Sequence, residues 1–190
     1  MKIGLYFGSF NPVHVGHLII ANHILNETDI KKIWFIVSPQ NPFKTETSLL
    51  NEYHRLYLLK LATEDDNRVK ASDIEFHLPR PSYTSNTLAY LQEKHPTQQF
   101  VLIMGGDSFQ NLNKWKNWEA IVAHYEILVY LRPGFKTDNK IKAKLTVLEA
   151  PQLEVSSTQI REYIKKGKSV RYLVPDKVYE EIIRGNYYKK

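Results

Sequence analysis

Two histidines three positions apart, His14 and His17, are the first side chains in the sequence whose types and spacing could do chemistry. They stand in the stretch LYFGSFNPVHVGHLII, where an apolar run stops at Gly8 and a helical pattern begins near Gly16. Glycine lets the backbone approach a ligand closely, and a helix N-terminus offers unpaired amides and a partial positive charge. The pattern therefore predicts a phosphate site in which both imidazole rings reach one polyphosphate.

A metal site and ordinary surface histidines are the alternatives to this phosphate site. An H-x-x-H spacing can bind a metal ion, but the sequence offers no obvious third ligand, because His23 points to a different part of the helix. The pair also fits surface or capping histidines. The stretch is not a Walker loop, because the Gly-Lys-Ser/Thr ending is absent. Its position after a strand and a glycine turn favours the anion site.

A second group of candidate phosphate ligands stands far along the sequence, in VSSTQIREYIKKGKSVRYLVP. Ser156 or Ser157 is suited to cap a helix, and Arg161 falls about one turn into that helix. Hydroxyls, free amides and a guanidinium can converge on phosphate oxygens through charge-assisted hydrogen bonds. An ordinary capped helix with a solvent-facing arginine would look the same. A binding role is favoured because two anion sites can then serve one ligand.

The elements that must position these groups alternate between strand and helix. Apolar and β-branched runs predict strands, and apolar residues at helical spacing predict helices. This order favours a doubly wound, mainly parallel α/β sheet flanked by helices, whose ligands bind at the carboxyl ends of the strands. We expect strands over 3–7, 33–37, 69–76, 100–104, 127–131 and, more weakly, 146–148, and helices over 16–26, 52–63, 85–94, 157–166 and 175–184.

The composition limits the class of protein. The 190 residues, of which 43% are hydrophobic and 24% charged, fit one globular domain. We expect this domain to span 1–190 and to include a helical portion from about 155 to 190. The absence of cysteine excludes disulfides and thiolate metal sites. No apolar run approaches the roughly 18 to 20 residues of a membrane span, and MKIGLYFGSF lacks the features of a signal peptide, so a cytoplasmic protein is expected.

The formal charge of +6 fits a phosphate-bearing partner, including nucleic acid. Many of the lysines stand near the C-terminal end, where such charges are typical of a solvated surface. A nucleic-acid-binding module would bind oligonucleotides with a steep salt dependence, and it would leave both phosphate motifs unexplained. We therefore expect small-molecule substrates, no nucleic acid and no membrane; a homo-oligomer is compatible with the sequence.

Both phosphate motifs resemble those of the nucleotidyltransferase superfamily. GSFNPVHVGH is similar to its signature, in which an H-x-G-H motif holds ATP phosphates, and SSTQIR matches its S-S-T-x-I-R motif. Asn11 stands where the family often has aspartate, so the local turn can differ. The resemblance implies a Rossmann-like nucleotidyltransferase fold with ATP contacts from Gly8, Ser9, Phe10, His14, Gly16, His17, Ser157, Thr158, Ile160 and Arg161.

Further segments resemble the bacterial nicotinate-nucleotide adenylyltransferases. SPQNPFK is similar to their P-x-x-P-H-K loop, with Phe43 in place of the histidine, and implies that Lys44 reaches ATP phosphates. LRPG matches their R-P-G and implies that Arg132 is a cation of the nucleotide site. Without the resemblance, either residue would be read as a surface charge. YLVPDKVYEEI is similar to the entry into the family's C-terminal helix, which is structural.

Two more segments resemble the part of this family that binds the mononucleotide. RPSYTSNTL is similar to P-S-Y-T-x-D-T-L, with Asn86 replacing aspartate, and implies that the Thr84 amide helps to hold the nicotinate carboxylate. The alternative is a plain turn into a helix capped by Ser85. The segment LIMGGDSFQNLNKWKNW is similar to the family's G-x-D-x-L-x-x-L-x-x-W. This resemblance implies that Gly105 and Asp107 contact the nucleotide. It also implies that Trp115 stacks on the pyridine ring and that the Lys116 amide contacts the carboxylate.

Phe109 takes the place of the first leucine in that last pattern. An indole face suits a flat, electron-poor ring, which supports the stacking role of Trp115. Core or lid packing is the alternative for both tryptophans of the segment, and it is the expected role of Trp118.

The reaction implied by the resemblance joins nicotinate mononucleotide to the AMP part of ATP, giving deamido-NAD and pyrophosphate in NAD biosynthesis. The attacking phosphate is already anionic at neutral pH, so no general base is needed and catalysis depends on orientation and charge stabilisation. Mg²⁺ is expected on the triphosphate, held by phosphate and water, with no protein-bound metal. We assign charge stabilisation to His14, His17, Lys44 and Arg161, and hydrogen bonds to Ser157 and Thr158.

Three related enzyme classes are the alternatives. An adenylyltransferase that acts on nicotinamide mononucleotide would differ only in the segments that bind the carboxylate. The phosphopantetheine adenylyltransferases share both phosphate motifs but usually carry threonine where His14 stands. Aminoacyl-tRNA synthetases have a motif like H-x-G-H, yet this chain has no room for a tRNA-binding domain.

Overall fold

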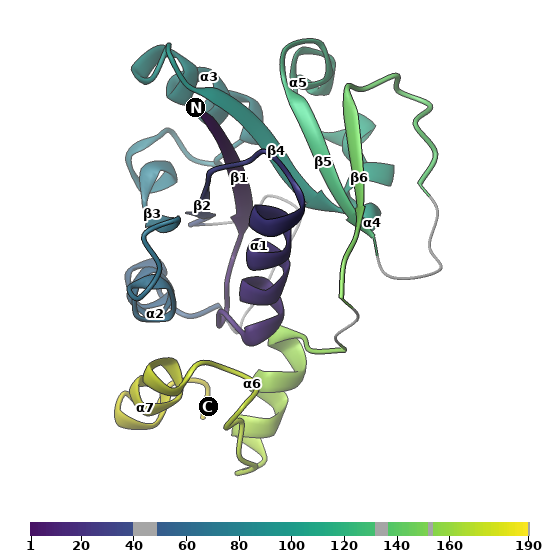
Figure 1. Cartoon of the computed structure of the whole chain (residues 1–190). Coiled ribbons are helices and arrows are strands. Elements are labelled where there is room, and N and C mark those ends of the chain that lie inside the picture. The colour runs from purple at the N-terminus through teal and green to yellow at the C-terminus, as the bar shows by residue number, and fades with distance from the viewer. Residues whose placement is uncertain (40–48, 132–136, 152–153, 190) are drawn as a thin grey trace.

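A six-stranded parallel sheet forms the centre of the protein, with helices on both of its faces (Figure 1). The computed structural model describes residues 1–39, 49–131, 137–151 and 154–189. The sheet is doubly wound and parallel, as predicted from the sequence, and its strand order β3-β2-β1-β4-β5-β6 reverses direction between β1 and β4. The strands are β1 (Lys2–Gly8), β2 (Lys32–Val37), β3 (Val69–Ser72), β4 (Gln99–Gly105), β5 (Glu126–Leu131) and β6 (Leu145–Glu149).

The third strand is shorter than predicted. It ends at Ser72, and a 3₁₀ helix, η1 (Ile74–His77), replaces the second half of the expected strand. The Ser72 hydroxyl accepts a hydrogen bond from the Ile74 amide, and the Phe76 amide donates to Asp73 O at 2.8 Å. These local bonds turn the chain out of the sheet, which the apolar pattern alone does not reveal.

Helices connect the strands and complete the other two layers. The sequence pattern did not predict α4, η2 and α5, because segments of three to seven residues are too short to show a helical period. Among the described residues, no helix is long and apolar enough to cross a membrane. The helices are α1 (Val15–Glu27), α2 (Glu52–Thr63), α3 (Thr84–Lys94), α4 (Gly106–Gln110), η2 (Leu112–Lys114), α5 (Trp118–His124), α6 (Ser157–Lys165) and α7 (Asp176–Arg184).

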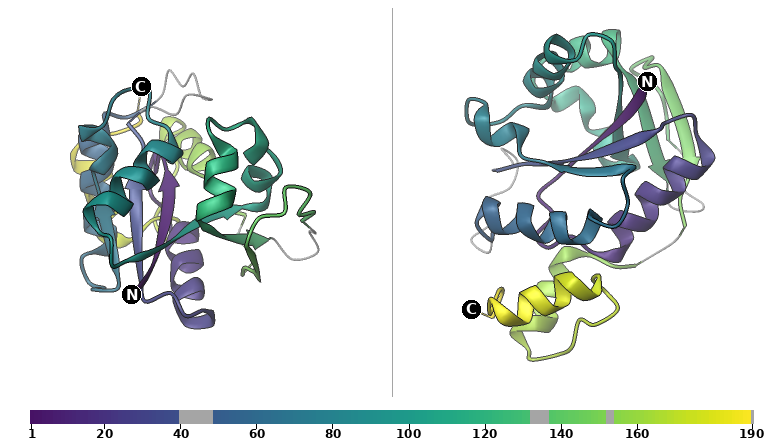
Figure 2. Two further views of the ribbon diagram at one scale, coloured as in Figure 1. Left: turned by 90° about the horizontal axis from the view of Figure 1, so that it is seen from above. Right: turned by 60° about the vertical axis from the view of Figure 1, so that its left-hand side comes forward.

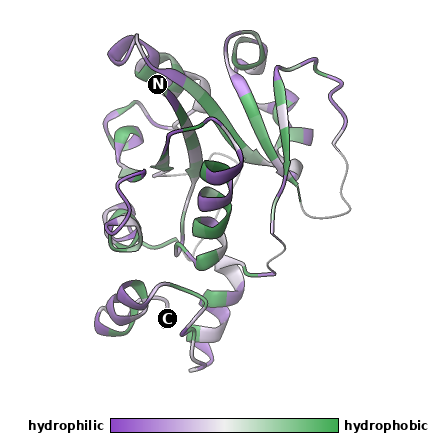
Figure 3. Cartoon of the chain, viewed as in Figure 1, coloured by the Kyte–Doolittle hydropathy of each residue, from purple (hydrophilic) through white to green (hydrophobic). Residues whose placement is uncertain are grey.

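The core consists of two hydrophobic clusters, one on each face of the sheet. On β4, Val101 and Ile103 belong to the cluster that includes residues of α1, α2, α6 and α7, whereas Leu102 and Met104 belong to the cluster covered by α3 and α5. Figure 2 shows the two helical layers, and Figure 3 shows hydrophobic residues along the strands. Strands covered on both faces read as continuous apolar runs, which explains why β4 and β5 were predictable.

The two C-terminal helices lie together near the carboxyl ends of the strands (Figure 1). The Lys177 ammonium pairs with the carboxylates of Glu64 and Asp65 just after α2. The Tyr187 ring stacks on His54 of α2 with ring centroids 5.0 Å apart. These contacts fix α7 against the remainder of the protein, and α6, which carries the second phosphate motif, shares the same hydrophobic cluster with α7.

Candidate active site

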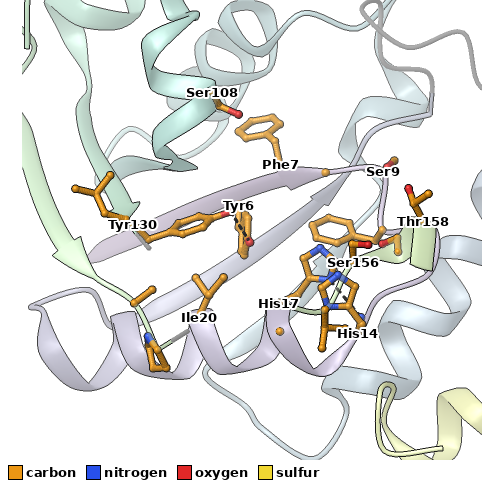
Figure 4. Close-up of a pocket in the computed structure, with 18 of the residues that line it drawn as sticks. Tyr6, Phe7, Ser9, His14, His17, Ile20, Ser108, Tyr130, Ser156 and Thr158 are labelled. Atoms are coloured by element: carbon orange, nitrogen blue, oxygen red, sulfur yellow. Dashed lines mark hydrogen bonds between the residues drawn. The ribbon is translucent and has the colours of Figure 1, made fainter. Parts of the chain in front are cut away.

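A cavity of about 470 Å³ opens at the carboxyl end of β1 (Figure 4). Its wall is built from the loop after β1, the first turns of α1 and α6, and the end of β5. This is the place where the doubly wound order reverses and where such folds bind ligands. Of the residues predicted to contact ATP, it brings together Gly8, Ser9, Phe10, His14, Gly16, His17, Ser157, Thr158 and Arg161.

Direct hydrogen bonds join the two phosphate motifs. The Ser157 hydroxyl donates to Pro12 O at 2.8 Å, across a sequence separation of 145 residues. Arg161 Nη1 donates to Asn11 O, also at 2.8 Å. The Arg161 side chain is 7% exposed, so the alternative of a solvent-facing arginine is wrong. The C-terminal motif thus packs directly against the loop that carries the N-terminal motif.

Local sequence explains why α6 presents its first turn to the cavity. Ser156 is the N-cap, and its hydroxyl accepts a hydrogen bond from the Gln159 amide at 3.2 Å. The cap fixes the start of the helix, so Ser157 and Thr158 fall in the first turn with their hydroxyls beside the cavity. A helix start of this kind offers free amides and a partial positive charge to an anion.

His14 and His17 lie against each other, with ring centroids 3.7 Å apart and ring planes 30° apart. The His14 amide donates to Nδ1 of His17 at 3.2 Å. Nδ1 therefore accepts, so a neutral His17 ring carries its proton on Nε2 and can donate from there. Gly16 suits this close approach, because a Cβ atom at this position would lie 3.0 Å from Nδ1 of His14, which is tighter than an ordinary contact.

Both histidines are neutral at pH 7. Burial lowers the pKa of His14 to about 4. Burial, together with repulsion by a charged His14, lowers the pKa of His17 well below its usual value. The edge of the Phe10 ring, with its centroid 5.1 Å from that of His17, helps to exclude water. The pair therefore offers hydrogen-bond donors, and Arg161 supplies the permanent positive charge on this side of the cavity.

The histidine pKa values predict how stability depends on pH. Below pH 6.5 an unfolded chain protonates His14, while the folded protein keeps it neutral until about pH 4. The unfolded state then binds more protons, so the free energy of unfolding falls as the pH is lowered. We expect the titration of His14 to lower the free energy of unfolding by about 2 kcal/mol between pH 7 and pH 5. Urea unfolding at both pH values should show a smaller loss for His14→Asn than for the wild type; equal losses would contradict the assignment.

The opposite end of the cavity contains a pair of tyrosines that the sequence did not single out. The Tyr6 and Tyr130 hydroxyls lie 3.0 Å apart, beside Ile20 of α1 (Figure 4). Gly105 on the intervening strand β4 makes room for this pair, because a Cβ there would lie 3.3 Å from the Tyr130 hydroxyl. Two tyrosines near the carboxyl ends of strands in the same sheet were the signal available in the sequence.

The described residues that were predicted to bind the mononucleotide lie outside the lining of this cavity. Thr84 begins α3, with Tyr83 rather than Ser85 at the N-cap, which corrects the predicted helix start by one residue. The Lys116 ammonium lies 4.3 Å from the centroid of the Tyr83 ring, so the segment after η2 approaches the N-terminus of α3. Trp115 and Trp118 both pack against the hydrophobic cluster on the α3 side of the sheet. Gly105 ends β4, and Asp107 is exposed in α4.

Three residues singled out from the sequence, Lys44, Phe43 and Arg132, lie outside the described residues. The Ile160 side chain is 0% exposed and belongs to the hydrophobic core, so the predicted ATP contact of this residue falls to its backbone and stays a prediction. Its amide donates to Ser156 O within the helix. The structure therefore gives Ile160 a packing role, because its side chain lies in the cluster to which α1 and α2 also contribute.

The described part of the chain does not place three or more His, Cys, Asp or Glu side chains where they could hold a metal ion. The H-x-x-H pair in particular has two stacked rings and no carboxylate beside it in the cavity lining. This donor set does not suit a protein-bound metal. It suits phosphate oxygens, which accept hydrogen bonds from imidazole, hydroxyl and guanidinium groups.

Comparisons with known proteins agree with this geometry. Residues 5–163 match the cytidylyltransferase-like family. A protein of Flavobacterium psychrophilum named probable nicotinate-nucleotide adenylyltransferase is 52% identical over 193 aligned residues that cover both chains completely, and one of Flavobacterium johnsoniae with the same name is 50% identical with the same coverage. The solved nicotinic acid mononucleotide adenylyltransferase of Plasmodium falciparum complexed with NaAD has the same fold, with a TM-score of 0.83, 24% identity, and 98% and 97% of the two chains covered. The chain belongs to the cytidylyltransferase-like family and, within it, to the nicotinate-nucleotide adenylyltransferases.

Proposed function

We propose that this enzyme transfers the adenylyl group of ATP to nicotinate mononucleotide, giving nicotinate adenine dinucleotide and pyrophosphate, a step of NAD biosynthesis. The observation that carries the proposal is the convergence of the two phosphate motifs on one cavity, where Ser157 and Arg161 bond to Pro12 and Asn11 beside the histidine pair. A cavity of about 470 Å³ fits a nucleotide. The names of the relatives supply the acceptor substrate.

The chemistry requires placement and charge stabilisation. The 5′-phosphate of the mononucleotide attacks the α-phosphorus of ATP in line, and the bond from that phosphorus to the pyrophosphate oxygen breaks. The nucleophile is already anionic, so no proton has to be removed. Negative charge grows on the leaving pyrophosphate, where the N–H group of His17 and the guanidinium of Arg161 can donate hydrogen bonds. Lys44 is proposed to add a second positive charge.

We propose that Mg²⁺ enters the site with ATP as part of the substrate. Phosphate oxygens and water would hold it, because the described residues provide no cluster of metal ligands. The ion would neutralise part of the triphosphate charge and favour departure of pyrophosphate. We also propose that the enzyme works in the cytoplasm, where its nucleotide substrates are found, and that it binds neither nucleic acid nor membranes.

The N-terminus of α3 is the proposed site of the nicotinate carboxylate. The helix begins at Thr84, and its backbone hydrogen bonds to the Tyr83 carbonyl start at the Asn86 amide, so the amides of Thr84 and Ser85 face the helix entrance. Lys116 lies beside this entrance, over the Tyr83 ring. Helix dipole and cation both favour a carboxylate here, which distinguishes nicotinate from the neutral amide of nicotinamide.

Substitution of Trp115 tests the pyridine site. We expect Trp115→Ala to raise KM for nicotinate mononucleotide roughly tenfold, because a stacking contact of about 1 to 2 kcal/mol is lost. KM for ATP should change little. Trp115→Phe, which keeps an aromatic face, should retain most of the affinity. Steady-state kinetics with each substrate varied in turn provide the measurement, and a normal KM for the mononucleotide in Trp115→Ala would reject the stacking role.

A parallel assay with three acceptors tests the proposed function. Purified enzyme is incubated with MgATP and nicotinate mononucleotide, nicotinamide mononucleotide or phosphopantetheine, and pyrophosphate release is followed. We expect the highest kcat/KM with nicotinate mononucleotide. A higher value with nicotinamide mononucleotide would contradict the carboxylate site at α3 and the choice of acceptor, and activity with phosphopantetheine alone would overturn the proposal.

A further inference from the structure

Arg55 is a fully buried arginine, 0% exposed, that lies outside both phosphate motifs. It stands in the fourth position of α2, and its guanidinium points back to the loops that precede the helix. Nε donates to Leu50 O at 2.8 Å, Nη1 to Ser9 O at 2.5 Å and to Ser38 O at 2.9 Å, and Nη2 to Pro39 O at 3.0 Å. A charge buried to this degree needs strong hydrogen bonds, and four carbonyl oxygens provide them.

The four carbonyls belong to three different segments. Ser9 follows β1, Ser38 and Pro39 follow β2, and Leu50 precedes α2. One planar group therefore ties together the carboxyl ends of two adjacent parallel strands and the start of the next helix. Only arginine has enough donors in a fixed plane for this, because the lysine ammonium is a point charge on a flexible stem.

The bond to Ser9 has a consequence for the wall of the active site. The peptide that joins Ser9 to Phe10 is trans, since the cis peptides of the described chain precede Pro12 and Pro81. In a trans peptide the C=O and N–H groups point in opposite directions. With the Ser9 carbonyl held by the buried Arg55, the Phe10 amide points away from Arg55, and both Ser9 and Phe10 line the cavity.

Phe10 needs such support because its φ is 44°, in the left-handed region that disfavours side chains other than glycine. Among the described residues, no backbone hydrogen bond outside the regular elements uses the Phe10 amide as donor. The loop is also held two residues further on, where Arg161 Nη1 donates to Asn11 O. Two buried guanidinium groups thus hold this loop at positions two residues apart.

We propose that Arg55 is a positioning residue for adenylyl transfer: by binding the Ser9 carbonyl it aims the Phe10 amide at a phosphate oxygen of bound ATP. Through Ser38 and Pro39 it also fixes the start of the loop after β2 relative to the phosphate site. Arg55 itself touches no substrate. The proposal rests on the proposed function for the identity of the reaction, and on the hydrogen bonds above for the role of this residue.

The first test uses the wild-type protein. In ¹⁵N-labelled enzyme titrated with MgATP or a non-hydrolysable analogue, the Phe10 amide proton should move downfield and become protected from exchange, as expected for a new bond to phosphate. Loss of either effect, with ATP bound, would overturn the proposal. This measurement needs no substitution, so it stands even if every Arg55 variant fails to fold.

The second test compares Arg55→Lys with Arg55→Ala, each checked for folding by circular dichroism. We expect Arg55→Lys to lower kcat/KM for ATP roughly tenfold, the scale of a small misplacement of substrate groups, and to weaken the downfield shift of Phe10. Added guanidinium ion should restore part of the activity of Arg55→Ala, because it can occupy the vacated space between the carbonyls. Arg68→Ala is the matched control, since Arg68 pairs with Asp66 at the surface and should keep wild-type kinetics.

Normal ATP kinetics and an unchanged Phe10 signal in a folded Arg55→Lys protein would show that Arg55 has only a structural role. Failure of the proposed function would look different. In that case the wild type would not adenylylate nicotinate mononucleotide, while the response of the Phe10 amide to ATP and its dependence on Arg55 would persist.

Discussion

Replacement of His17 by alanine should lower kcat by about 10²-fold or more, the usual effect of removing one preorganised donor to a developing charge. The physical basis is the hydrogen bond from the His14 amide to Nδ1 of His17, which leaves the proton of the neutral ring on Nε2. A donor held in this way needs no reorganisation when charge appears on the leaving pyrophosphate. The alanine side chain removes one of the donors to that charge in a partly dry cavity and leaves the others, Arg161 among them, to stabilise it.

Steady-state kinetics at saturating ATP and nicotinate mononucleotide measure this effect. His23→Ala is the matched control, because His23 lies on the same helix and bonds to Glu149 O outside the cavity. The control should keep a kcat close to that of the wild type. An unchanged kcat in His17→Ala would show that His17 does not stabilise the leaving pyrophosphate. The C-terminal motif would then have to stabilise that charge.

The second large effect is expected for Arg161→Met, which keeps much of the aliphatic length but removes the guanidinium. We expect kcat/KM for ATP to fall about 10²-fold. Two losses combine here: a charged donor to phosphate disappears from the cavity, and Asn11 O loses the bond that joins it to α6. Arg161→Lys keeps the positive charge but lacks the planar guanidinium, so its kcat/KM for ATP should lie between those of the wild type and Arg161→Met.

Initial rates with ATP varied at fixed nicotinate mononucleotide give the required ratio. Arg171→Ala serves as control, because Arg171 is exposed in the same C-terminal region and packs over the Tyr179 ring. If Arg161→Met kept the wild-type kcat/KM, the meeting of the two motifs would be a feature of folding alone.

Much of this architecture was readable from local pattern. The continuous apolar runs of β1, β2, β4 and β5 are typical of strands covered on both faces, and the period of α2 predicted its bounds without error. The two phosphate motifs were visible because each occupies ten or fewer neighbouring positions. Their convergence also followed from the fold class, since carboxyl ends of parallel strands meet at one edge of a sheet.

The parts that escaped prediction depend on contacts between distant segments. Nothing near His14 in the sequence indicates that it is neutral, because the water is excluded by packing that brings Phe10 and His17 around it. Arg55 looks like an ordinary polar residue of an amphipathic helix, and only the folded structure reveals that its side chain turns inward to four carbonyls. Ile160 sits inside a binding motif yet serves the core.

The bond between Arg161 and Asn11 has a consequence for synthesis of the protein, because it spans 150 residues. During translation the ribosome completes the N-terminal phosphate motif early, whereas it completes the second phosphate motif, on α6, only near the end. While the nascent polypeptide lacks α6, the N-terminal motif has no α6 beside it, and we expect it not to retain ATP. We therefore expect catalytic activity to appear only near the end of synthesis, and a product of premature termination upstream of α6 to be inactive.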